Sequence, residues 1–243
     1  GQWRDMVCRG FMLELHRAGY IHLPAKKFTP NNPLINRKPP ERIPVDQSPL
    51  STSLNQVRPL RFLQVRRHGK EKLFNSLIAT YHYLGYCQPV GEHLKYMVFA
   101  GKRPIACLCF SSAPRHIRCR DQFIGWDADT RKKNLSFMAY NTRFLVLPWV
   151  NIKCLASHIL AQVVRILPED WQRLYHHRVY YLETFVDTQR FKGTCYKAAN
   201  WICLGKTTGR GKNDQTGKPN RSLKAVYGYP LVKDFRKRLA GVS

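Results

Sequence analysis

Acidic side chains are scarce in this sequence: 15 Asp and Glu stand against 41 Lys and Arg, which gives 243 residues a formal net charge of +26. Long apolar runs are also missing, since no stretch approaches the 18 residues of a membrane-spanning helix. The first residues show no signal-peptide pattern. We therefore expect a cytoplasmic protein without a membrane partner. A charge excess of this size opposes compact folding unless a polyanion neutralises it, so the composition predicts DNA as the partner, with RNA as an alternative.

Paired cysteines are absent too, because none of the eight cysteines forms a CxxC pair. Without such spacing a zinc site is not predicted, and reduced thiols are expected. Apolar material is plentiful, at 44% hydrophobic and 12% aromatic residues. That is enough for a folded core, which excludes a wholly disordered basic tail.

Proline and glycine divide the chain into three regions. Residues 1–24 are expected to form a helix ended by Gly19 and then a short extended wing, a partial winged-helix-like segment. Residues 25–59 hold seven prolines and predict a linker free of regular secondary structure. Residues 60–243 hold the core. Because the first helix has no cap before it, we expect the chain to begin inside a larger unit.

The core alternates strands and helices after an early hairpin, which predicts an α+β fold with a mixed sheet flanked by helices. The expected strands are 60–65, 94–99, 104–110, 143–147, 180–186 and 201–205. The expected helices are 71–81, 130–140, 156–167 (ended by Pro168) and 191–199.

Two carboxylates lie four residues apart in the segment LETFVD. In a strand, residues i and i+4 share a face, so Glu183 and Asp187 are expected to point the same way. Paired carboxylates bind Mg²⁺ or divide the roles of general acid and base, which makes both residues candidate catalytic groups and metal ligands. In so basic a chain, the alternative is that Asp187 caps the next turn and Glu183 neutralises an arginine.

Aromatic and polar groups gather in the segments YHYLGY and GTCYKAANW. His82 is a candidate base near neutral pH, and Tyr83 is a candidate nucleophile or base-stacking platform. If the second segment is helical, Tyr196 and Asn200 share a face, and Tyr196 is a further candidate catalytic residue. Asn200 can read an adenine edge, and Trp201 can stack on an extruded base. Aromatic packing at helix ends is the alternative for both segments.

Basic residues crowd the C-terminal region, where residues 206–243 carry ten Lys and Arg and two acids. The glycine-rich segment 205–221 predicts a loop that orders on a phosphate backbone. It lacks the strand–GxxxxGK[ST]–helix arrangement, which excludes an ATP-binding P-loop. The candidate nucleic-acid-binding residues are Arg131, Lys132, Arg143, Asn200, Trp201, Lys206, Arg210, Lys212, Lys218 and Arg221.

Several segments together resemble the DruA family, which is named from the Druantia anti-phage systems and also occurs beside or fused to transposases. They are ATYHYLGY (79–86), FIGWDADTRKKNL (123–135), NTRFLVLPWV (141–150), LASHIL (155–160) and LETFVDTQRFKGTCYKAANWICLGKTTGRGK (182–212). Residues 4–24 resemble the later half of the family's N-terminal DNA-binding-like segment, so a shortened member is expected. The resemblance implies a role in defence or in a mobile element, with other defence-system or transposon proteins as partners.

The order of the expected elements is similar to that of GNAT-type acyltransferases. In addition, GTCYKAANWICLGKT (193–207) resembles the last helix and strand of phage Mom-type DNA-modifying members of that fold. This resemblance implies a GNAT-like core. Acetyl-CoA users usually place a glycine-rich loop before a helix, where backbone amides hold the pyrophosphate. The corresponding segment here, LPWVNIKCLASH (147–158), has no glycine, which argues against acetyl-CoA as the cofactor.

Three functions are compatible with these patterns. The first is a DNA-processing protein that nicks or transfers strands through His82, Tyr83, Glu183, Asp187 and Tyr196. The second is a Mom-like acyltransferase that modifies DNA bases. The third is a non-catalytic DNA-binding subunit on a degenerate acyltransferase-like fold.

Overall fold

The computed structural model describes residues 5–25, 38–209 and 219–241, and it divides into two compact units, residues 1–38 and 39–243. In the first unit, α1 (Asp5–Arg17) ends before Gly19, whose φ of +81° suits glycine. The helix expected at the start of the chain is therefore present. The expected wing is not a strand: residues 21–25 are irregular, and the Leu23 N–H donates back to His16 Nδ1.

The second unit is built on a seven-stranded sheet with the order β2-β3-β4-β5-β7-β9-β8. Its strands are β2 (Leu60–Gln64), β3 (His93–Ala100), β4 (Arg103–Ser112), β5 (Met138–Val146), β7 (Tyr181–Asp187), β8 (Ile202–Lys206) and β9 (Lys224–Pro230). All neighbours are antiparallel except β5 and β7. The predicted α+β fold with a mixed sheet is confirmed, and its element order is the GNAT-like one.

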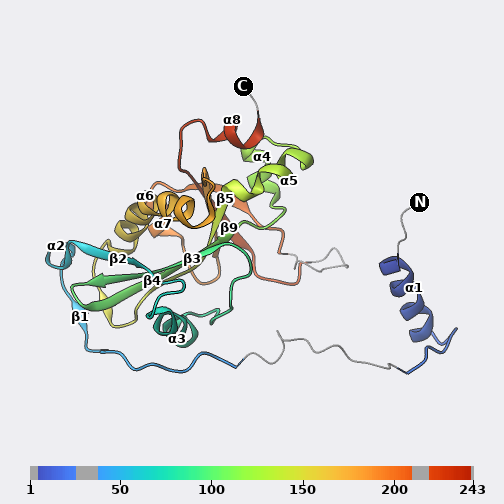
Figure 1. Ribbon diagram of the computed structural model, residues 1–243, viewed down its shortest axis with the longest axis horizontal. Helices are drawn as coiled ribbons and strands as arrows, with labels where there is room; N and C mark the ends of the chain where they lie inside the picture. Colours follow the sequence, from blue (N-terminus) through green and yellow to red (C-terminus); the bar gives the residue numbers. More distant parts are fainter. Residues whose placement is uncertain (1–4, 26–37, 210–218, 242–243) are drawn as a thin grey trace. The chain divides into compact units, whose positions relative to one another are not determined.

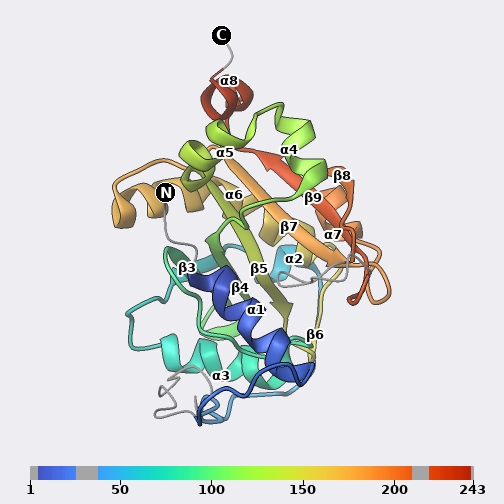
Figure 2. The same ribbon diagram turned by 90° about the vertical axis from the view of Figure 1, so that its right-hand side faces the viewer.

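The parallel pair at the centre of the sheet is short. Met138–Asn141 of β5 pair with Tyr181–Thr184 of β7, and the two strands separate beyond that point. Figure 2 shows β5 and β7 diverging toward their C-terminal ends. A gap between strands in the middle of a sheet needs side chains or a ligand to fill it, because buried backbone groups need partners.

Helices cover both faces of the sheet, as the alternation along β3 demonstrates. The Lys95 ammonium donates to Glu71 in α3 (Glu71–Tyr81), whereas the next residue, Tyr96, donates its hydroxyl to Asp170 in α6 (Leu155–Tyr175). Successive strand residues point to opposite faces, so α3 and α6 lie on opposite sides of the sheet (Figure 1). The short helix α7 (Thr194–Ala198) contacts α6.

A second group of helices packs around a smaller apolar cluster. It consists of α4 (Arg118–Ile124), α5 (Ala128–Asn134) and α8 (Phe235–Ala240), and the 3₁₀ turn Leu135–Phe137 follows α5. The buried members of the cluster include Trp126, Tyr181 and Leu239. Figure 1 shows these three helices together at one end of the sheet, next to β5 and β9.

The proline-rich region 38–59 holds two short elements, contrary to the prediction. β1 (Leu50–Ser51) pairs in parallel with β6 (Val150–Asn151), and α2 (Leu54–Val57) forms one helical turn. The segment is also fastened to the core, because the Ile43 N–H donates to Ser76 Oγ in α3 at 2.8 Å.

Three predicted helices are wrong in extent, and the one expected over 191–199 is reduced to α7, Thr194–Ala198. The helix expected over 130–140 ends at Asn134, and Met138 onward belongs to β5, where pairing with both neighbouring strands outweighs helix propensity. Pro168 does not end α6, which continues to Tyr175 because Trp171 and Tyr175 beyond it pack on the sheet. α4, β9 and α8 were not predicted. In the described residues, no helix is long and apolar enough to cross a membrane.

Candidate functional site

A cavity of about 480 Å³ lies where β5 and β7 separate. Three stretches line it: the end of α3 and the following turn, the second half of β5 with the start of α6, and the end of β7 with the loop into α7. Lys224 at the start of β9 adds one further lining residue. Four of the five predicted catalytic residues belong to the lining, namely His82, Tyr83, Asp187 and Tyr196. The sheet topology thus brings together groups that are more than 100 residues apart.

His82 is the C-cap of α3 and is held by the turn that follows. Its Nδ1 accepts the Leu84 N–H at 3.2 Å, which leaves Nε2 as the other ring nitrogen. Burial and the positive charge of Arg143 lower the pKa of His82 to about 4, so the ring is neutral at physiological pH. Since Nδ1 accepts this hydrogen bond, the proton of the neutral ring is on Nε2, and the ring can donate a hydrogen bond from Nε2.

Tyr83 lies at the exposed edge of the cavity in a cluster of aromatic rings. Its ring stacks on His82 at 4.9 Å and approaches Phe191 at 5.4 Å, and the Arg190 guanidinium lies 5.2 Å from the ring centroid. Tyr83 is 40% exposed and Phe191 50% exposed, so both present ring surface to solvent. Burial raises the pKa of Tyr83, which disfavours a phenolate nucleophile and favours a stacking surface.

Asp187 ends β7 and faces the cavity with a carboxylate that already has partners. It accepts hydrogen bonds from the Gln189 N–H and from Ser222 Oγ, each at 3.1 Å. The predicted alternative for this residue, a cap on the following turn, therefore matches its contacts, and the same carboxylate also lines the cavity.

Tyr196 closes the far wall of the cavity from α7. Its hydroxyl donates to Asn141 Oδ1 at 2.7 Å, and Asn141 Nδ2 donates in turn to the Cys109 and Arg143 carbonyls. Burial raises the pKa of Tyr196, so the phenol stays protonated. Gly193 starts this wall at φ +68°, and a Cβ there would lie 2.5 Å from Tyr227 Oη. Tyr196 is thus a fixed neutral donor.

Glu183 is not at the cavity, although its spacing from Asp187 predicted a pair. It is fully buried, and its Oε1 accepts from Arg120 Nη1 at 3.1 Å. Its Oε2 is buried without a hydrogen-bond partner in the described part of the chain. Burial raises the pKa of Glu183 to about 7 in spite of Arg120. The alternative that Glu183 neutralises an arginine matches these contacts.

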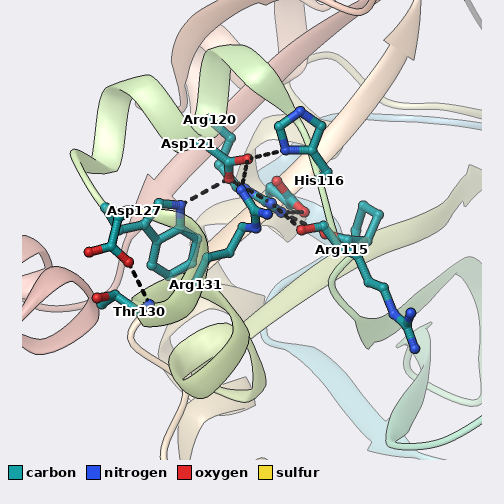
Figure 3. A network of polar contacts seen from close by, with 10 residues as sticks. Arg115, His116, Arg120, Asp121, Asp127, Thr130 and Arg131 are labelled. Carbon is teal, nitrogen blue, oxygen red and sulfur yellow. Dashed lines mark hydrogen bonds and ion pairs between the residues drawn. The ribbon is translucent and has the colours of Figure 1, made fainter. Parts of the chain in front are cut away.

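Arg120 is the centre of a polar network between α4 and β7, drawn in Figure 3. Its guanidinium donates to Asp121, Glu183 and the Pro114 carbonyl. Asp121 also accepts from Trp126 Nε1 and pairs with His116 and Arg131. These contacts fix the loop before α4 to the sheet, which is a structural task.

No group of three or more His, Cys, Asp or Glu side chains that could hold a metal ion occurs in the described residues. With Glu183 paired to Arg120 and Asp187 capped by Ser222, the two carboxylates do not form a joint Mg²⁺ site in this arrangement. A magnesium site remains a prediction.

The predicted nucleic-acid-binding residues are dispersed. Lys132, Asn200, Lys206 and Arg221 are exposed, whereas Arg131 pairs with Asp121, and Arg143 donates to the Gly85 and Thr142 carbonyls beside the cavity. Arg210, Lys212 and Lys218 lie outside the described residues.

Two predictions in the segment 193–201 are corrected by burial and backbone geometry. Trp201 is only 3% exposed and packs against Tyr196 and Tyr229, so it cannot stack on a base. Asn200 lies beyond the end of α7 with φ +62°, so it does not share a helical face with Tyr196.

The segment 147–158 keeps the backbone shape that its lack of glycine seemed to exclude. Cys154 precedes α6 with φ +63°, the left-handed region that favours glycine. Ala156 at the start of α6 lines the same cavity, and beyond Asn141 and Thr184 the facing edges of β5 and β7 are not paired with each other. A left-handed residue therefore occurs directly before α6 without glycine, so the lack of glycine by itself does not argue against acetyl-CoA.

Sequence reasoning missed much of the lining. Tyr140 and Phe185 face each other across β5 and β7 at 4.9 Å, and Arg190, Phe191 and Lys192 form the rim near Tyr83. The signal was the combination of aromatic and basic residues in FVDTQRFK, which overlaps the end of LETFVD, the segment with the two candidate carboxylates.

Comparison with solved structures finds N-acetyltransferases. An N-acetyltransferase from Staphylococcus aureus matches with 10% identity and a TM-score of 0.42, over 71% of this chain and 97% of that chain. The ribosomal-protein-S18-alanine N-acetyltransferase from Escherichia coli has 10% identity, a TM-score of 0.42 and coverages of 71% and 94%. An aminoglycoside acetyltransferase, solved with coenzyme A and kanamycin, has 12% identity, a TM-score of 0.44 and coverages of 74% and 98%.

Comparison with curated proteins gives no match. The family model described as "Druantia protein DruA" matches residues 14–218, which include α3, the whole lining of the cavity up to Tyr196, and β8. This range covers most of the chain. The chain therefore belongs to the DruA family of the Druantia anti-phage systems.

Proposed function

We propose that this DruA-family protein binds DNA and processes it at the cavity between β5 and β7. The observation that carries the proposal is the convergence of His82, Tyr83, Asp187 and Tyr196 on one cavity, although they were selected from separate sequence segments. The net charge of +26 supports a polyanionic partner.

The lining favours a nucleobase as the group that enters. Aromatic rings from α3, β5, β7 and the β7–α7 loop offer flat apolar surfaces, and base–aromatic stacking stabilises single-stranded contacts by about 1–3 kcal/mol per base. Asn141, Thr184 and Asp187 add polar groups for the base edge. Arg190 and Lys192 at the rim suit the phosphates that flank an extruded or single-stranded nucleotide.

In this arrangement the chemistry is proposed to take place on the base rather than at a metal-bound phosphate. Neutral His82 donates a hydrogen bond from Nε2, Tyr83 stacks, and the Tyr196 hydroxyl holds Asn141 in one orientation. Strand nicking with Tyr83 as the nucleophile is the competing reaction, and a covalent protein–DNA adduct at Tyr83 would argue for it.

Acyl transfer to a base is the second candidate. The unpaired edges of β5 and β7 and the turn at Cys154 favour it. A bound acyl thioester would supply the acyl group, while this chain would orient the base. The proton that the amino group of the base loses would pass to the departing thiolate, so the step needs no base from the chain. Further proteins of the defence system are proposed partners.

The test is incubation of labelled single- and double-stranded DNA with the full chain in Mg²⁺, in EDTA and with acetyl-CoA. Gels detect cleavage or covalent protein–DNA adducts, and mass spectrometry detects modified bases. Tyr83→Phe should keep activity if the ring stacks, and Tyr83→Ala should lose about fivefold to 150-fold, since a lost stacking contact costs about 1–3 kcal/mol. Tyr180→Ala, a half-buried tyrosine at the start of β7 and outside the cavity, is the matched control.

Loss of activity in Tyr83→Phe as complete as in Tyr83→Ala would assign a chemical role to the hydroxyl and contradict the stacking role. Binding without any DNA product in all three conditions would favour the non-catalytic subunit.

A further inference from the structure

A second concave site lies at the end of the sheet where β2 begins and the β3–β4 turn lies. It is a groove of about 680 Å³. One wall is the segment Leu50–Pro59, and the other is formed by Arg61, Ala100, Gly101 and Arg103. It shares no lining residue with the β5–β7 cavity. The fastening of the proline-rich segment to the core therefore builds a groove that the sheet alone would not have.

Three arginines face this groove: Arg58, Arg61 and Arg103. Arg61 lies over the Phe99 ring at 4.3 Å, and Arg103 is fixed by the Ser48 carbonyl and by Asp46, 3.5 Å from its Nε. In the described residues, Arg58 and Arg61 take part in no ion pair, and the buried Arg103 Nε has no hydrogen-bond partner. Asp46 is thus the only carboxylate in the described part of the chain that pairs with any of the three guanidinium groups, and its partner is Arg103.

Guanidinium groups suit phosphate, because their donors form a planar fork that binds phosphate oxygens in pairs. The remaining lining is mostly apolar, with Leu50, Val57 and Pro59 on one side and Ala100 on the other, and Gln56 adds one amide. An apolar wall beside several cations fits a ligand with a flat organic part and more than one phosphate. The volume is in the range of small-molecule sites.

We propose that this groove binds a nucleoside polyphosphate, with the phosphates at Arg58, Arg61 and Arg103 and the base or sugar against Leu50, Val57 and Pro59. The site is independent of the proposed DNA-processing function. A phosphodiester backbone is the competing ligand, and it would track a surface open at both ends rather than rest on an apolar wall.

The experiment is isothermal titration calorimetry of the full chain with ATP, with inorganic phosphate and with a thymidine oligonucleotide. ATP should bind more tightly than phosphate. Arg61→Gln and Arg58→Gln should each weaken ATP about tenfold to hundredfold, as expected for a lost charge-assisted hydrogen bond. Arg61→Lys should bind ATP with an affinity between those of Arg61→Gln and the wild type, since lysine keeps the positive charge but lacks the planar fork of donors.

Lys102→Gln is the matched control, because Lys102 is an exposed cation of the β3–β4 turn outside the groove, and its ATP affinity should equal that of the wild type. Tyr83→Ala should also bind ATP normally, which separates this site from the cavity. The proposal is overturned if ATP does not bind at millimolar concentration. It is also overturned if Arg58→Gln and Arg61→Gln change nothing, or if the oligonucleotide displaces ATP with the same arginine dependence.

Discussion

The buried carboxylate of Glu183 provides a sharp test of the account, and Glu183→Gln is the perturbation. In the folded chain the pKa of Glu183 lies at about 7, against an ordinary value near 4.5. Because each tenfold change in proton affinity corresponds to about 1.4 kcal/mol, the ionised form is disfavoured by about 3 kcal/mol on folding. The cause is burial, which outweighs the attraction of Arg120 at 3.1 Å.

The sign follows from proton linkage. A folded-state pKa above the unfolded value means that the folded protein binds more protons between pH 4.5 and 7, so the Glu183 contribution is complete below pH 4.5 and is lost as the pH rises through 7. Glutamine cannot ionise. The difference in free energy of unfolding, variant minus wild type, should therefore rise by about 3 kcal/mol between pH 4.5 and pH 8.

Urea unfolding followed by tryptophan fluorescence at four pH values measures this difference. Glu169→Gln, the same change at an exposed position of α6, is the control and should show a flat difference. A flat or falling difference for Glu183→Gln would mean that the ion pair with Arg120 outweighs burial, and it would refute the reasoning. Glu183→Gln should leave DNA affinity unchanged, since the residue lies outside the cavity.

Three further predictions concern the cavity and its walls. His82 is neutral above its pKa of about 4, so kcat/KM on DNA should stay level from pH 7 to 5.5 and fall only toward pH 4. A fall centred near pH 6.5 would contradict the lowering of this pKa by burial and Arg143. Trp201→Ala should lower the free energy of unfolding by about 3–5 kcal/mol, as for other buried aromatic residues. The salt dependence of DNA affinity should stay unchanged in the folded fraction, and a flatter salt slope at unchanged stability would instead indicate that Trp201 binds DNA. Gly193→Ala should destabilise by about 1–3 kcal/mol, because φ is +68° and the new Cβ meets Tyr227, and thermal melting that matches the wild type would contradict this packing.

Helices and strands with a clear local sequence pattern were predicted correctly. The helix over 71–81 is confirmed at both ends, since its apolar face is clear and Gly85 follows. The hairpin of β3 and β4 is confirmed because its turn, Gly101-Lys102, has an evident glycine signal. β5 was misread at its start because Met138 and Ala139 carry good helix propensity, and only the two neighbouring strands in the sheet decide against a helix.

For the candidate site, sequence patterns identified single residues but not which of them lie together. His82 and Asp187 were found because their side chains are unusual in their segments, yet nothing local indicated that they face one cavity. Strand periodicity placed Glu183 and Asp187 on one face but could not reveal that Arg120, 63 residues away, would take up Glu183. The bulk of Trp201 suggested stacking, whereas the sheet buries it between Tyr196 and Tyr229.

The central claim is that a DNA base enters the cavity between β5 and β7. Photocrosslinking of a single-stranded oligonucleotide that carries 5-iodouracil, followed by mass spectrometry of the peptides, tests it most directly. The account predicts crosslinks to Tyr83, Phe185 or Phe191, reduced by Tyr83→Ala and retained in Tyr180→Ala. Crosslinks confined to residues outside this lining, unaffected by Tyr83→Ala, would contradict it.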